Sequence, residues 1–158
     1  IALRSENWPV AERKLLALRE QYPDSPGIMI NLGILYQNLE RDSEAEQLFR
    51  EAIAVSSDVD AYNLLGVSLR RQGRFDEALA AYRDALAIDP EHADTHRNIG
   101  ILYDVYLGEP VKAKRHYLAY QSALPEPDER VAGWVTELEY RSRQAMPAPA
   151  PTETQDVQ

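Results

Sequence analysis

Hydrophobic and polar positions follow helical spacing along most of the chain. The clearest stretch lies between residues 60 and 90, where Gln72-Gly73-Arg74 separates two apolar faces and Asp89-Pro90 ends the second. The two faces consist of Leu65, Gly66 and Leu69, and of Ala78, Tyr82 and Ala85. Residues three and four apart share one side of a helix, so the pattern predicts a helical hairpin. Its small residues let the two backbones approach closely.

The same spacing continues on both sides of this stretch and predicts an all-α fold. The expected helices cover about 8–22, 26–39, 42–55, 59–72, 75–88, 92–106, 109–123 and 128–144. Asp42, Asp58 and Pro110 stand at or near expected helix starts, where a capping carboxylate or a fixed φ is favoured.

The hairpin pattern recurs along the chain. Gly33 precedes Gly66 by 33 residues, and Gly100 follows Gly66 by 34. In the helix after each glycine, a small residue and an aromatic residue keep the same offsets: Ala45 and Phe49, Ala78 and Tyr82, Ala113 and Tyr117. This periodicity resembles the tetratricopeptide repeat. The three glycines then have a steric role at helix crossings, and no glycine spacing is typical of a phosphate-binding loop.

The resemblance implies a right-handed superhelical solenoid of helical hairpins. Three full repeats are expected at 26–58, 59–92 and 93–126, after the second helix of a partial repeat at 1–25 whose preceding helix ends at Ile1-Ala2-Leu3. The third repeat carries one extra residue near Leu107-Gly108, and Met29, Tyr62 and His96 stand where the family has tryptophan.

The last expected helix lies within residues 127–145. Val131, Trp134, Val135 and Leu138 occupy one side of it, which is typical of a helix that caps the final repeat. A partner-docking helix is the alternative. Residues 146–158 alternate proline and alanine at first and are expected to form a disordered tail.

Composition narrows the classes of function. The 158 residues carry a net charge of −9 at pH 7, which argues against a nucleic-acid partner. The absence of cysteine excludes disulfides and thiolate metal sites. No run of 18 apolar residues exists that could span a membrane.

Candidate catalytic and metal-binding residues have structural explanations. His92 and His96 are four apart, a spacing that can chelate a metal, but no HExxH is present and His96 occupies a packing position. His116 lies among lysines and arginine and is expected on a solvated basic face. Ser68 lacks a nucleophile motif. The sequence therefore predicts no catalytic residues, no metal and no cofactor, and the protein is not expected to be an enzyme.

The resemblance also implies a concave wall formed by the first helix of each repeat. The positions that face it, carried over from the family, are Ile30, Ile34, Asn63, Val67, Arg70, Arg97, Ile101 and Asp104, with Gln37, Asn38, Arg71 and Val105 beside them. Arginine and asparagine there can bind a carboxylate and a peptide backbone. Ile34, Val67 and Ile101 replace the asparagines of the family's two-carboxylate clamp, which excludes that form of recognition.

The run from Asn98 to Arg141 is similar to the last repeat and cap of bacterial cell-envelope scaffolds of this family. That similarity favours the periplasm or cell envelope and leaves the cytoplasm open. The predicted function is a non-catalytic adaptor that binds a protein or peptide segment in the groove, within a pilus, secretion or energy-transduction assembly. A homo-oligomerising module and the regulatory region of a larger enzyme are the alternatives.

Overall fold

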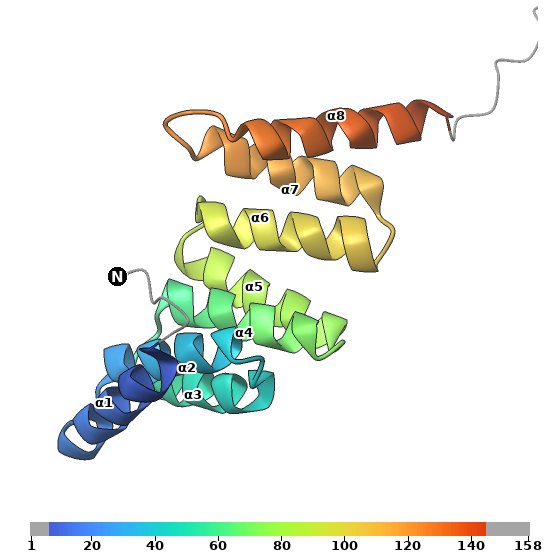
Figure 1. Ribbon diagram of the computed structural model, residues 1–158. Helices are drawn as coiled ribbons and strands as arrows, with labels where there is room; N and C mark the ends of the chain where they lie inside the picture. The colour runs from blue at the N-terminus through green and yellow to red at the C-terminus, as the bar shows by residue number, and fades with distance from the viewer. Residues whose placement is uncertain (1–6, 145–158) are drawn as a thin grey trace, which may run out of the picture.

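The computed structural model describes residues 7–144, and in this part of the chain all regular structure is helical (Figure 1). The helices are α1 (Trp8–Gln21), α2 (Pro26–Asn38), α3 (Asp42–Val55), α4 (Val59–Arg71), α5 (Phe75–Ile88), α6 (Ala93–Ile101), the π-helix η2 (Leu102–Tyr106), α7 (Pro110–Ser122) and α8 (Glu129–Gln144). The all-α prediction is confirmed. The expected preceding helix at Ile1-Ala2-Leu3 and the tail at 146–158 lie outside the described residues.

The helices form two layers of a curved solenoid. Consecutive helices pair as α2 with α3, α4 with α5, and α6 with α7, and the pairs stack in sequence order (Figure 1). Contacts of α4 with α2 and with α6 are more extensive than contacts between successive second helices such as α3 and α5. The stack therefore curves toward an inner layer of α2, α4 and α6, and the outer layer of α1, α3, α5 and α7 is more open.

Each pair is held together by a close crossing between a glycine and an aromatic ring. A Cβ added to Gly33 would lie 2.5 Å from Cε1 of Phe49. A Cβ at Gly66 or Gly100 would overlap the ring of Tyr82 or Tyr117 in the same way. All three rings are almost completely buried, as are Ala45, Ala78 and Ala113 beside them. Any larger residue at these glycines would force a packed ring to move.

The turns between paired helices share one backbone conformation. Gly73 and Gly108 have φ values of 77° and 64°, in the left-handed region that glycine adopts readily. The first hairpin has Glu40 at the matching position, with φ 59°. The backbone N–H of Arg41 and of Arg74 each donates to a carbonyl five residues earlier, as in a Schellman cap.

The third repeat differs from a continuous helix over residues 92–106. Gly100 and Gly108 are one residue further apart than Gly66 and Gly73. The extra residue is accommodated by the π-helix η2, so α6 ends at Ile101 and a wider turn follows. The helix expected at 92–106 is thus present over 93–106, with π-helical spacing in its last five residues.

Asp42, Asp58 and Pro110 all stand at helix starts, as expected, but only one of the two carboxylates makes a capping hydrogen bond. The Asp58 carboxylate accepts a hydrogen bond from the Ala61 N–H (2.9 Å) and caps α4, and Pro110 begins α7. Asp42 is not a capping residue. It is the first residue of α3, and its carboxylate instead pairs with Arg71 at 3.2 Å.

The hydrophobic core runs along the whole stack. One cluster of buried side chains extends from α2 to Ile99 and Leu102, and a second joins α7 to α8 through Val131 and Leu138. Tyr103 packs against both clusters and connects them. The apolar side of α8 thus covers the last pair of helices, while its polar side faces solvent.

Candidate functional site

The inner layer presents an interrupted apolar strip. Ile30 and Ile34 on α2, Val67 on α4 and Ile101 at the end of α6 are each partly buried against the core and partly accessible. At the N-terminal end of this layer, Ile34 lines a hollow of about 540 Å³ between α1 and α2. The strip therefore presents accessible apolar side chains on the three inner helices α2, α4 and α6.

Polar side chains connect the inner helices to one another. The amide nitrogen of Asn98 donates to Oδ1 of Asn63 (2.9 Å), and Gln37 donates to Oγ of Ser68 (2.8 Å). Asn63 is only 6% exposed. The structure thus places Asn63 mainly between two inner helices, with its carbonyl already engaged, and Ser68 in the packing between repeats.

Arg70 is one of three described residues, with Asp42 and Tyr82, that have a buried polar atom without a hydrogen-bond partner. Its side chain is partly buried at the junction of α4 and α6, and Nη1 donates only a long hydrogen bond to the Asn98 carbonyl (3.5 Å). Its buried Nε has no hydrogen-bond partner among the described residues, and no carboxylate there pairs with the guanidinium. The Tyr106 ring lies 5.9 Å away and is 46% exposed. The guanidinium of Arg70 is therefore partly desolvated and has few polar partners among the described residues.

The other charged groove candidates are already engaged. Arg97 pairs with Asp94 at 3.2 Å and lies over the Tyr120 ring at 5.6 Å. Asp104 accepts hydrogen bonds from Arg141 of α8 (2.8 Å) and from the Tyr117 hydroxyl (3.5 Å). These contacts tie α8 to the third repeat, so Asp104 serves the cap as well as the wall.

The three histidines occupy two places, because His96 and His116 contact each other and His92 lies at the start of α6. His92 caps α6 through its Nδ1, which accepts from the Thr95 N–H (3.3 Å). Nδ1 of His96 lies 3.0 Å from Nδ1 of His116. His116 is not on a solvated basic face, as the sequence predicted. It is partly buried, and burial, with smaller effects of His96 and Arg115, lowers its pKa to about 4.

Residues 7–144 lack two further kinds of site. The described part holds no group of three or more metal-ligating side chains. None of its helices has the length and apolar content needed to cross a bilayer.

The geometry defines a class: an all-helical repeat scaffold with an accessible inner wall. Comparison with known proteins gives the family. Models of the tetratricopeptide repeat match residues 27–57 and 59–92. Residues 27–92 therefore contain tetratricopeptide repeats, which are generally non-catalytic and bind proteins. Repeats of this kind support a role in protein interaction.

Solved structures share the fold. MamA superposes with a TM-score of 0.75 at 21% identity, covering 88% of this chain and 80% of MamA. PilF of Pseudomonas aeruginosa gives a TM-score of 0.78 at 23% identity, covering 88% of this chain and 63% of that chain.

A curated relative, the human protein O-mannosyl-transferase TMTC1, is 35% identical over 66 residues. The match covers 42% of this chain and 8% of the transferase, so it lies in a small part of a much longer protein.

Sequence reasoning named Arg70 but missed Tyr106, the exposed ring beside it. Tyr106 falls in the π-helix, where the extra residue shifts side chains out of the register that the family pattern would assign. The one available signal was the longer spacing between Gly100 and Gly108.

Proposed function

We propose that the protein binds an extended or helical segment of a partner on the inner layer, with Arg70 contacting a carboxylate of that segment. The apolar strip of Ile34, Val67 and Ile101 supplies contact area, and Asn63 and Arg97 contribute through donors that their present contacts leave free. Binding involves no covalent step.

The unsatisfied guanidinium of Arg70 carries this proposal. Burying a charge without a partner costs free energy, so an arginine in that state is unfavourable for stability alone. A carboxylate from a bound segment would pair with the accessible part of the guanidinium, and arginine–carboxylate bonds are among the stronger polar contacts in proteins. Tyr106 offers a stacking surface for the same segment.

The test separates binding from stability. Replacing Arg70 by methionine keeps the apolar stem and removes the charge. We expect the Arg70→Met melting temperature to equal or exceed that of the wild type, while partner binding falls. Arg83→Met is the matched control, because Arg83 is exposed on the outer side of α5.

Binding is measured by photo-crosslinking of the full-length protein in its native cells. A photoreactive phenylalanine analogue at Val67 should crosslink a partner, and Arg70→Met should reduce the yield of that product whereas Arg83→Met should not. An undiminished yield in Arg70→Met, or a lower melting temperature that explains the loss, would refute the role of Arg70.

We further propose that the assembly is a bacterial envelope complex. The similarity of Asn98–Arg141 to cell-envelope scaffolds of the family supports this placement. Fractionation of the native cells tests it: recovery of the full-length protein with cytoplasmic markers alone would overturn the placement and leave the groove proposal intact.

A further inference from the structure

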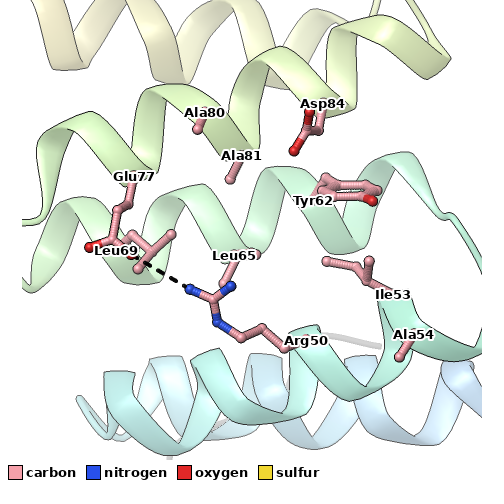
Figure 2. A pocket seen from close by; sticks show the side chains of 10 residues that line it. All are labelled: Arg50, Ile53, Ala54, Tyr62, Leu65, Leu69, Glu77, Ala80, Ala81 and Asp84. Atoms are coloured by element: carbon pink, nitrogen blue, oxygen red, sulfur yellow. Dashed lines mark ion pairs between the residues drawn. The ribbon is translucent and has the colours of Figure 1, made fainter.

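The outer layer has a hollow of its own, distinct from the inner wall. It lies between α3 and α5, has a volume of about 370 Å³, and its floor is formed by Tyr62, Leu65 and Leu69 of α4 (Figure 2). The hollow exists because the adjacent outer helices carry only methyl groups at Ala54, Ala80 and Ala81. Small side chains on the two helices thus leave a hollow with an apolar floor, of which Tyr62 is the partly accessible residue and Leu65 and Leu69 are buried.

The ends of this hollow differ in charge. At one end Arg50 and Glu77 face each other at 3.9 Å, and Arg50 also pairs with Glu46 at 2.9 Å (Figure 2). That cation is therefore neutralised by its neighbours. Asp84 lies at the other end, exposed, and has no ion-pair partner within residues 7–144. One carboxylate at the mouth of the hollow remains free.

The unpaired carboxylates near the hollow lie on α5. Of the seven carboxylates on α3 and α5, five pair with arginines, whereas Asp76 and Asp84 have no ion-pair partner within residues 7–144. Helix α5 therefore contributes uncompensated negative charge beside the hollow. A positively charged ligand is attracted there, and a negatively charged one is repelled.

We propose that this outer hollow is a second docking site, and that its occupant is a segment of another protein with an apolar side chain next to a lysine or arginine. The apolar side chain enters between Ala54 and Ala80 and rests on Leu65 and Leu69. The basic side chain reaches Asp84. The charge of this ligand is opposite to that proposed for the inner wall, where Arg70 binds a carboxylate.

Three blocked octapeptides serve as probes: Gly-Ser-Phe-Gly-Lys-Gly-Ser-Gly, the same peptide with glutamate for lysine, and the same peptide with glycine for phenylalanine. Binding is followed by the backbone amide shifts of the ¹⁵N-labelled protein. The lysine peptide should shift the amides of Tyr62, Leu65, Ala81 and Asp84. The glutamate peptide should bind more weakly, and the peptide without phenylalanine should cause no comparable shifts.

Two variants test the two halves of the site. Ala80→Leu fills the hollow from an exposed position and should abolish the shifts, while Ala87→Leu, outside the hollow on the same helix, should leave them unchanged. Asp84→Asn should weaken the lysine peptide about two- to five-fold, as expected for an exposed ion pair. Asp76→Asn is the matched control. Both alanines and both aspartates are exposed, so the variants should keep the fold.

The proposal is overturned if the lysine and glutamate peptides bind equally, if Ala80→Leu has no effect, or if the shifts map to Val67 and Ile101 on the inner wall. Arg70→Met distinguishes the two surfaces. It should leave binding at the outer hollow unchanged, so either site can fail without the other.

Discussion

Replacing Gly66 by leucine should destabilise the central hairpin. The added side chain would occupy the space now filled by the Tyr82 ring, which is fully buried. Overpacking of a core typically costs about 1–3 kcal/mol, and a fully buried ring places this site toward the upper end. The better helix propensity of leucine offsets less than about 1 kcal/mol. We expect a net loss of about 2 kcal/mol, or roughly 4–8 °C in melting temperature for a chain of this size.

Gly133 provides the control for this prediction. It is also inside a helix, but a Cβ there would meet no atom within 4 Å. Gly133→Leu should therefore gain helix propensity without overpacking and melt at or slightly above the wild-type temperature. Thermal unfolding of all three proteins is followed by circular dichroism at 222 nm. A Gly66→Leu protein that melts no lower than Gly133→Leu would refute the steric role of the glycine crossing.

Two further predictions concern pH and the first turn. Because the folded-state pKa of His116 is about 4 and the unfolded value is about 6.5, the unfolded chain binds more protons between these values, and stability should fall as pH drops through this range. Between pH 7 and pH 4, the free energy of unfolding of His116→Gln should fall by about 1–2 kcal/mol less than that of the wild type. Urea unfolding of both proteins at each pH measures this difference. An equal fall in the free energy of unfolding of the two proteins would contradict the prediction. Glu40→Gly should raise the free energy of unfolding by about 1 kcal/mol, because glycine adopts the positive φ of this turn without strain, and an unchanged urea midpoint would count against that assignment.

The repeat architecture was accessible from the sequence because it depends on residues whose chemistry is restrictive. Only glycine fits beside the rings of Phe49, Tyr82 and Tyr117, so the period of the glycines reports the period of the fold. The turn at Glu40 gave no such signal. A glutamate can adopt the left-handed conformation when the flanking helices require it, and nothing in its side chain marks the position.

The state of individual groove residues was not accessible in the same way. Asn63 and Arg70 are both polar residues of one helix at inner-facing positions, and the family pattern treats them alike. In the folded protein Asn98 satisfies Asn63, whereas the Nε of Arg70 remains unpaired among the described residues. The difference arises because the hydrogen-bond partner of an inner residue comes from the next repeat. Asn98 supplies a partner for Asn63, and no side chain does so for the Nε of Arg70 among the described residues.

Charge location changes what the composition implies about partners. A net charge of −9 would by itself favour a basic partner everywhere on the surface. Helix α2 has no charged residue, and the acidic groups of α6 and η2, Asp94 and Asp104, are paired with Arg97 and Arg141. Arg70 is thus an inner cation without an ion-pair partner among the described residues, while Asp76 and Asp84 are carboxylates without such a partner on the outer helix α5. A bound segment responds mainly to charges within about one Debye length, roughly 8–10 Å at moderate salt. The inner and outer layers can therefore select ligands of opposite charge, although the protein as a whole is acidic.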